Sequence, residues 1–341
     1  MKKRRNELSV PILILAFALA LSGCGGAADK GEAPKQAQAA ENSSNAKDAT
    51  AAAQGSDNAE PEMTDGWPRT IVDAAGIETV LEAKPERIAV LHPLYLDYFF
   101  ALGQPPVASA SAGEALAEFV TLQPYAAGAD ILDLGSGRDL NLETIMEADP
   151  DVIVTFQGHI DAIYDDLVRI APVIQIGYSD DWQDATRLCA RIIGHEEQAE
   201  QYIEETKQLI AQTRSQLAPL EDLTYALVRV DGKANFVAQG KNNTVYYNEE
   251  SGFGLHAPES YPEDSANLSL ESLAAMDPDV LIIQHDLDTA RAAVEALEPM
   301  AVWQSLKAVQ NDRVLLLDNS LNSSSILAVR SAAEHFSKLA D

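Results

Sequence analysis

The sequence predicts an α/β protein built from two doubly wound lobes that are joined by a single long connecting helix. Three observations lead to this prediction. Unbroken aliphatic runs, each a candidate strand, alternate with helical patterns at residues 66–180 and again at 221–341. Residues 181–220 between them carry only helical patterns. The segment LNLETIMEADPDVIV at 140–154 also returns nearly unchanged as LSLESLAAMDPDVLI at 268–282. Strands without polar alternation are typical of parallel sheets covered by helices on both faces.

The first lobe is expected to open with a hairpin. Two short extended segments, 69–72 and 78–81, flank the sequence Asp73-Ala-Ala-Gly76, which favours a turn. Further strands are predicted at 87–91, 105–110, 152–156 and 172–176, and helices at 94–103, 141–148 and 161–170. Because strands and helices alternate, we expect these strands to form a parallel sheet.

The connecting region and the second lobe follow the same reasoning. A helix over 182–194 should end at Gly194, and a longer helix over 195–217 carries apolar residues every three or four positions, on one face. In the second lobe, strands are predicted at 223–230, 235–240, 280–283 and 313–317, and helices at 244–252, in the second repeat, at 303–309 and at 323–339.

The first 65 residues have the features of a targeting segment and a tether. Basic residues precede an apolar run from Pro11 to Leu21, which has the length of a signal-peptide core and is too short to span a bilayer. The run ends in Leu21-Ser22-Gly23-Cys24, which resembles a bacterial lipobox. We therefore expect a signal peptide at 1–23 and a lipid on Cys24; an ordinary signal peptide with a chance cysteine is the alternative. The polar residues at 24–65 predict a flexible tether.

Composition excludes several classes of function. The formal net charge of −29 argues against nucleic-acid binding and against electrostatic docking on anionic lipid, so a lipid anchor would have to hold the chain at the membrane. Besides Cys24 there is only Cys189, in an apolar helical stretch, where we expect a small core residue. No nucleophile elbow, phosphate loop or dinucleotide fingerprint is present, and GSGRDL at 135–140 has too few glycines in the relevant spacing. We expect a protein that is not an enzyme and that needs no cofactor.

Each copy of the repeat begins with a helix-capping residue, Asn141 in the first and Ser269 in the second. Glu143 and Glu271 then fall in the first helical turn, where a carboxylate faces the positive end of the helix dipole. The simplest interpretation is that each glutamate stabilises the start of its helix by roughly 0.3–1 kcal/mol. Duplicated helices would duplicate their caps, so the pairing alone indicates nothing further.

The order of the motifs resembles a known family. A lipobox and tether are followed by PERIAVL, NLETIMEADPDVIV, IAPVI, a long helix, NLSLESLAAMDPDVLII and VWQSLKAVQNDRV. This order resembles the class III binding proteins of bacterial ABC importers, which serve ferric siderophores, cobalamin and haem. The resemblance implies two lobes with the ligand between them. It also implies that Glu143 and Glu271 form salt bridges with arginines of a permease dimer.

The expected protein is therefore a ferric-siderophore-binding lipoprotein. The resemblance places it on the extracytoplasmic face of the cell membrane, and the long tether suits a Gram-positive organism. Its partners would be the siderophore, the permease dimer and, through the lipid, the membrane. We expect the chain to act as a monomer.

Ligands of open α/β sheets bind beyond the carboxyl ends of the strands, so polar and aromatic residues at those positions are candidate contacts. The candidates are His92, Tyr95, Arg138, Gln157, His159, Tyr178, Trp182, Arg229, Gln239, Asn243, His285, Asn319 and Asn322. Arg138 and Arg229 stand out because arginine suits oxygen-rich anions and many ferric siderophores are anionic.

Two alternatives remain open at this point. Tyr178 and Trp182 could seat the connecting helix on the lobe instead of contacting a ligand. His92, His159 and His285 could converge on a bare transition metal or a haem iron, and cobalamin is a further possibility. In the preferred interpretation the protein itself supplies no direct metal ligand.

Overall fold

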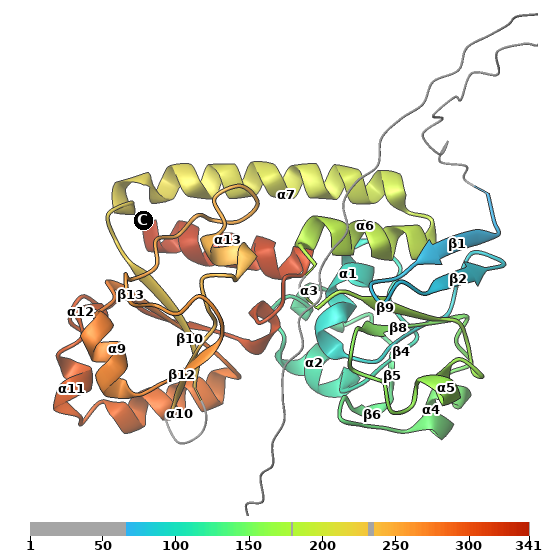
Figure 1. The fold of residues 1–341 in the computed structure, drawn as a ribbon, viewed down its shortest axis with the longest axis horizontal. Helices are drawn as coiled ribbons and strands as arrows, with labels where there is room; N and C mark the ends of the chain where they lie inside the picture. The colour runs from blue at the N-terminus through green and yellow to red at the C-terminus, as the bar shows by residue number, and fades with distance from the viewer. Residues whose placement is uncertain (1–65, 179, 231–234, 341) are drawn as a thin grey trace, which may run out of the picture. The chain divides into compact units, whose positions relative to one another are not determined.

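The structure is a computed structural model that describes residues 66–178, 180–230 and 235–340 (Figure 1). The predicted signal peptide, Cys24 and the predicted tether lie outside the described residues. The described part consists of an N-lobe that runs from β1 to α6 and a C-lobe that runs from β10 to α13. Helix α7 passes over both lobes (Figure 1).

The predicted hairpin is confirmed at the start of the N-lobe. Strands β1 (Arg69–Val72) and β2 (Glu78–Leu81) pair antiparallel. The Asp73 side chain organises the turn, because its Oδ1 accepts hydrogen bonds from the backbone N–H of Ala75 and of Ile77, each at 2.9 Å. Its Oδ2 accepts a third bond from Gln175 N–H at 3.1 Å, which ties the hairpin to the main sheet.

The N-lobe sheet is entirely parallel, as the alternating pattern predicts. Its strand order is β5-β4-β3-β8-β9, and all four neighbouring pairs run parallel. The strands are β3 (Ile88–Val90), β4 (Ala108–Ser109), β5 (Leu132–Asp133), β8 (Val152–Phe156) and β9 (Val173–Ile176). The helical segments are η1 (Pro93–Tyr95), α1 (Leu96–Ala101), α2 (Ala112–Glu118), α3 (Gln123–Ala126), α4 (Leu142–Glu147) and α5 (Tyr164–Leu167). A small ribbon of β6 (Gly135–Ser136) and β7 (Asp139–Leu140) precedes α4.

The C-lobe sheet is mixed, which departs from the parallel pattern. Its order is β12-β11-β10-β13-β14, in which β10, β13 and β14 run parallel while β11 is antiparallel to both β10 and β12. The strands are β10 (Tyr225–Val230), β11 (Phe236–Ala238), β12 (Ala266–Leu268), β13 (Val280–Gln284) and β14 (Val314–Leu317). The chain between Val230 and Phe236 is too short for a crossover helix, so β11 has to return antiparallel.

The helices of the C-lobe differ more from the prediction than its strands do. They are α8 (Thr244–Tyr247), α9 (Leu270–Met276), α10 (Leu287–Leu297), α11 (Ala301–Gln304), α12 (Lys307–Gln310), η3 (Asn319–Leu321) and α13 (Ile326–Ala340). The single helix expected at 303–309 is two helices, because the buried Leu306 is extended between them. The Lys307 N–H then donates to Asp277 Oδ1 at 2.9 Å.

The two helices predicted at 182–194 and 195–217 are confirmed as α6 (Trp182–Ile193) and α7 (Glu196–Leu217), with a short η2 (Ala218–Leu220) after them. Gly194 separates them in the left-handed conformation, at φ 69°, as expected for a helix stop. Helix α7 contacts both α6 of the N-lobe and α13 of the C-lobe, so α7 is the connecting element. Helix α13 lies beneath α7 and contacts α1 and α6 of the N-lobe (Figure 1).

Both sheets are buried on both faces. Alternate residues of one strand enter different cores: Ile88 and Val90 of β3 join a core beneath α7, whereas Ala89 joins a core on the opposite face. In β13, Val280 and Ile282 join that same core beneath α7, whereas Leu281 joins a separate C-lobe core. The core beneath α7 is therefore continuous between the two lobes.

Candidate functional site

The repeated segment builds the same local structure twice. Asn141 caps α4 by accepting hydrogen bonds from the Glu143 and Thr144 N–H groups, and Ser269 caps α9 by accepting one from Ser272 N–H. After each helix the chain enters the left-handed region, at Asp149 and at Asp277, both with φ 45°. Aspartate tolerates this conformation better than most residues other than glycine.

A second aspartate in each repeat ties the helix to the first strand of its sheet. Asp151 Oδ2 accepts hydrogen bonds from the backbone N–H groups of Glu86 and Arg87, both at 2.8 Å, immediately before β3. Asp279 Oδ2 accepts from the Thr224 N–H at 3.0 Å and from the Thr224 hydroxyl at 2.9 Å, immediately before β10. The helix caps and the aspartates that the two repeats share therefore stabilise the fold.

The repeated glutamates take no part in this anchoring. Glu143 and Glu271 are both exposed, one on each lobe, in the first turns of α4 and α9. Hydrogen bonds from its own backbone N–H and from Ser269 hold the pKa of the Glu271 carboxyl below its usual value. Figure 1 shows α4 and α9 on the side of the molecule away from α7. The two carboxylates are thus available to a partner.

A cavity of about 580 Å³ lies between the lobes, and residues of both lobes line it. Six of the thirteen predicted ligand residues line this cavity: His92, Tyr95, Tyr178, Gln239, Asn243 and Asn322. The N-lobe residues follow the carboxyl ends of β3 and β9, which is where ligands bind in open α/β sheets. The structure thus brings together residues that are far apart in the sequence.

The N-lobe side of the cavity is an aromatic wall, formed by His92, Tyr95, Phe156 and Tyr178. Tyr95 stacks on Phe156 with ring centroids 5.7 Å apart, and His92 meets Phe156 edge to face at 5.3 Å. Tyr178 continues the wall beside Phe156 at 5.7 Å, with 75% of its surface exposed. Such a wall offers π faces and a few polar tips to a ligand.

The C-lobe side is an amide lip, formed by Gln239, Asn242, Asn243 and Asp264. Asn242 donates its side-chain N–H to Asp264 Oδ1 at 2.8 Å, which joins the two loops of the lip. Gly240, at φ 86°, permits this close approach, because a Cβ there would lie 2.5 Å from the Glu263 carbonyl oxygen. The hydrogen bond between Asn242 and Asp264 holds the lip together, and the lip presents amide and carboxylate groups to the cavity.

The predicted histidines do not form a single cluster of ligands. The His92 and His159 rings meet edge to face at 5.6 Å, but both nitrogens of His159 are engaged, with Thr155 Oγ1 at 2.9 Å and the Gly137 carbonyl at 2.6 Å. Burial and the neighbouring His159 lower the pKa of His92 to about 4, so this imidazole is neutral at neutral pH. Among residues 66–178, 180–230 and 235–340, no group of three or more His, Cys, Asp or Glu side chains could hold a metal ion.

Seven predicted residues do not line the cavity: Arg138, Gln157, His159, Trp182, Arg229, His285 and Asn319. Trp182 is 1% exposed and donates its indole N–H to the Ser251 carbonyl at 3.0 Å, so it seats α6 in the core. Arg229 donates to Asn319 Oδ1 at 3.0 Å, and burial lowers the pKa of its guanidinium. Arg138 is exposed on the turn between β6 and β7.

Sequence reasoning missed eleven lining residues: Leu94, Tyr98, Phe156, Gly177, Asp180, Asn242, Val245, Asp264, Ser265, Ser323 and Ser324. Phe156 could have been found, because it is the last residue of a predicted strand. Asp264 and Ser265 carried no such signal, since their loop reaches the cavity only through its contacts with the chain at 240–242.

A buried carboxylate joins the lobes beside the cavity. Asp97 of α1 accepts hydrogen bonds from the Thr121 hydroxyl at 2.9 Å and from the Ser325 hydroxyl at 2.5 Å. Ser325 in turn accepts from the Ala328 N–H at 3.1 Å, at the start of α13. Burial raises the pKa of Asp97 to about 7, although both hydroxyl bonds act in the opposite direction.

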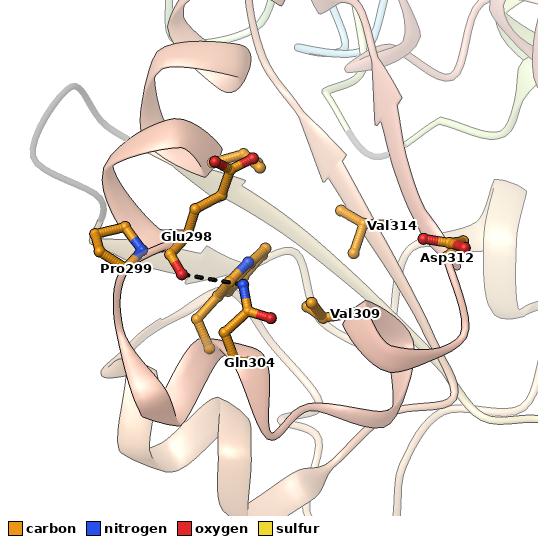
Figure 2. Close-up of a pocket in the computed structure, with 8 residues that line it drawn as sticks. Glu298, Pro299, Gln304, Val309, Asp312 and Val314 are labelled. Carbon is orange, nitrogen blue, oxygen red and sulfur yellow. Dashed lines mark hydrogen bonds between the residues drawn. The ribbon is translucent and has the colours of Figure 1, made fainter.

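A second cavity, of about 630 Å³, lies within the C-lobe near α10, α11 and β14. Figure 2 shows Glu298 and Gln304 at its edge, where the Gln304 side-chain N–H donates to the Glu298 carbonyl at 3.0 Å. It collects none of the predicted ligand residues, and only one lobe lines it. The cavity between the lobes is therefore the better candidate site.

Comparisons with known proteins agree with this geometry. A family profile for periplasmic binding proteins matches residues 88–321. The Fe(3+)-citrate-binding protein YfmC of Bacillus subtilis is 25% identical over 252 residues, covering 72% of this chain and 77% of the relative. The probable siderophore-binding lipoprotein YfiY of the same species is 24% identical over 277 residues, covering 76% of this chain and 82% of the relative.

Solved structures share the fold. The triscatecholate siderophore binding protein FeuA from Bacillus subtilis, complexed with ferri-bacillibactin, superposes with a TM-score of 0.67 at 20% identity, over 79% of this chain and 97% of that chain. Staphylococcus aureus SirA, complexed with staphyloferrin B, gives 0.65 at 20% identity, over 79% and 97%. Because the family profile spans both sheets from β3 to β14, the chain belongs to the periplasmic binding protein family.

Proposed function

We propose that the chain is the extracytoplasmic solute-binding protein of an ABC importer and that it captures a ferric siderophore between its lobes. The observation on which this proposal depends is the cavity of about 580 Å³ that both lobes line at the carboxyl ends of N-lobe strands. Its aromatic wall and amide lip are suited to holding a large, partly apolar chelate. We assign the aromatic wall and the amide lip to ligand binding and not to catalysis.

The names of the relatives support a ferric cargo. YfmC is named for Fe(3+)-citrate and YfiY for a siderophore, and FeuA was solved with a ferric triscatecholate. A direct transition-metal ligand receives no support from the described residues, because His159 has both ring nitrogens engaged. Haem and cobalamin remain as the alternatives that a titration would have to exclude.

We also propose that Glu143 and Glu271 dock the protein on a two-fold permease. Both carboxylates are exposed, each on its own lobe, and neither takes part in the anchoring that the rest of the repeat performs. Exposed charges of this kind fix orientation and speed encounter with a complementary partner. A two-lobed monomer would then present one anion to each half of the permease.

The proposed location is the outer face of the cell membrane, through a lipid on Cys24. Two relatives, YfiY and YhfQ of Bacillus subtilis, are named as lipoproteins. No helix within the described ranges has the length and hydropathy needed to cross a bilayer. Replacing Cys24 by Ala should move the protein from the membrane fraction to the medium, whereas continued membrane retention would contradict the anchor.

A fluorescence-quenching titration tests the proposed cargo. The purified protein is titrated with ferric siderophores of several classes, with haem, with cobalamin and with Zn²⁺ and Mn²⁺ salts. We expect saturable binding of at least one ferric siderophore with a Kd below about 1 μM, or roughly −8 kcal/mol. Saturation by haem, cobalamin or a bare metal alone would overturn the proposal.

A further inference from the structure

Among the described residues that line the cavity, the charged side chains are acidic. Among the described residues that line it, Asp180 and Asp264 are the only acidic ones, and the lining includes no Lys or Arg. His92 adds no positive charge at neutral pH, because burial and His159 lower its pKa to about 4. The lining is therefore anionic.

None of the described Lys or Arg side chains lines the cavity, although Arg229 lies near enough to Tyr178 of the aromatic wall to interact with it electrostatically. Arg229 donates to Asn319 Oδ1 at 3.0 Å outside the lining, and Arg138 is exposed on the ribbon before α4. Lys241 adjoins the amide lip, but its ammonium pairs with Glu263 at 2.8 Å. Neither Arg138 nor Arg229, both expected to contact an anionic cargo, is among the described residues that line the cavity.

The Asp264 carboxylate is held in place at the cavity. Its Oδ1 accepts from the Asn242 side chain at 2.8 Å, which leaves Oδ2 available to a ligand. The backbone on either side is fixed as well, because Lys241 N–H donates to the Pro262 carbonyl and Asn242 N–H to the Glu263 carbonyl, both at 3.0 Å. Asp180 is fixed in a similar way, with Oδ2 accepting from the Gly177 N–H at 2.8 Å.

The opposite wall favours the same kind of ligand. Tyr95, Phe156 and Tyr178 bring no positive charge to this wall, and Phe156 stacks on Tyr95 and on His159. A strongly anionic chelate would have to lose water beside two carboxylates, and no cation among the described lining residues would compensate. A neutral or cationic chelate would meet no such penalty.

Resting on the proposed function, we propose that the cargo is a ferric chelate without net negative charge, of the trihydroxamate class. Three singly charged hydroxamates cancel the charge of Fe(III), and a free ammonium on the chelator makes the complex cationic. Three doubly charged catecholates leave the complex strongly anionic. The Asp264 carboxylate is assigned to the cationic or hydrogen-bond-donating periphery of the bound chelate.

Three chelates test this assignment: a linear ferric trihydroxamate with a free ammonium group, a neutral cyclic ferric trihydroxamate, and a ferric triscatecholate. Each is titrated at low and at physiological ionic strength. We expect the better trihydroxamate to bind at least about tenfold more tightly than the triscatecholate. Tighter binding of the triscatecholate would overturn the assignment and leave the proposed function standing. Failure of all ferric chelates to bind would overturn both.

A matched pair of variants identifies the carboxylate. Asp264→Asn should weaken binding of the cationic chelate by about threefold or more at low salt and change binding of the neutral one by less than twofold. Glu259→Gln removes the same charge from an exposed C-lobe side chain that does not line the cavity, and should leave both affinities within twofold. Equal effects of the two variants on the cationic chelate would overturn the role of Asp264, with melting temperatures confirming that both are folded.

Discussion

The N-lobe and the C-lobe build their repeated segments in the same way but present different surfaces to each other. In each lobe a capped helix, a left-handed aspartate and an anchoring aspartate lead into a central strand. Where the lobes face the cavity, the N-lobe supplies aromatic rings and the C-lobe supplies amides and a carboxylate. The sheets behind these surfaces also differ, one parallel and one mixed.

This contrast is consistent with two different roles, contact with a protein partner for the outward-facing surfaces and ligand binding for the inward-facing ones. The outward-facing repeat is alike in both lobes, as expected if both meet equivalent halves of a symmetric partner. The inward-facing surfaces differ, as expected if they grip opposite sides of a ligand that has no such symmetry. Stabilisation of the fold explains the aspartates and a helix-start role for the glutamates, and the exposed carboxylates of Glu143 and Glu271 are in addition accessible to a partner.

The largest expected effect concerns Asp97, where the two lobes meet. Its pKa is raised to about 7 in the folded state by burial, against about 3.9 when unfolded. The folded protein therefore binds the proton more tightly, so this residue's contribution to stability is full below about pH 4 and falls as the pH rises towards 7. The contribution of Asp97 to the free energy of unfolding should fall by about 4 kcal/mol over this pH range.

Urea denaturation of the wild type and of Asp97→Asn between pH 4 and 8 measures this effect. The free energy of unfolding of the wild type should fall relative to that of the variant as the pH rises. Parallel curves for the two proteins would contradict the assignment of the titration to Asp97.

The next effect tests the outward-facing half of the comparison. If the proposed docking on permease arginines is right, replacing Glu143 and Glu271 together by Lys should lower iron uptake by about a hundredfold, because the new charges would repel the partner at a cost of roughly 2–5 kcal/mol. Ligand affinity and melting temperature should change little. Uptake is measured in whole cells with radiolabelled ferric chelate.

A control variant reverses the charge of two other glutamates, one in each lobe. The double variant Glu147→Lys with Glu295→Lys alters two other exposed glutamates, one on each lobe. It should transport at close to the wild-type rate. If both double variants lose uptake equally, the effect is one of net charge, and the proposed docking contacts are refuted.

The anchoring aspartates should show a smaller effect that ranks the two repeats. Asp279→Ala should lower the free energy of unfolding by about 2 kcal/mol, because it leaves the partly buried Thr224 N–H and hydroxyl without their acceptor. Asp151→Ala should cost about 1 kcal/mol, because the N–H groups that it bonds are exposed to water. Denaturant titration measures both, and the reverse ranking would count against this explanation.

The smallest predicted effect tests the aromatic wall. Tyr178 is 75% exposed, so Tyr178→Ala should leave melting temperature unchanged while weakening ligand affinity by about fivefold, or roughly 1 kcal/mol. Tyr178→Phe keeps the ring and should bind nearly as well as the wild type. An unaltered affinity in Tyr178→Ala would remove this residue from the site.

Much of the fold could be predicted because aliphatic runs mark buried strands. Strand β8 was predicted with its observed bounds and β13 to within one residue, since both are continuous apolar segments. Helix α10 was missed, because its alanines and charges give a weak apolar pattern between Leu287 and Leu297. The antiparallel direction of β11 follows from the short connection between β10 and β11 and not from the residues of the strand itself.

The site was harder to predict than the fold. The rule that ligands bind beyond the carboxyl ends of strands pointed to His92, Tyr95 and Tyr178, which do line the cavity. The same rule could not distinguish Tyr178 from Trp182, which lies four residues later and is buried. Whether a side chain faces the cavity depends on packing against α6 and on loop contacts from distant residues. Asp264 reaches the cavity through such contacts, which no local pattern encodes.

The location of bound iron tests the central claim most directly. Crystals of the protein grown with its tightest-binding ferric chelate would give an anomalous difference map at the iron absorption edge. We expect one iron peak in the cavity between the lobes, with the chelate touching both the aromatic wall near Tyr95 and the amide lip near Asn243. An iron peak in the C-lobe cavity beside Glu298, or one contacted by a single lobe, would contradict this expectation.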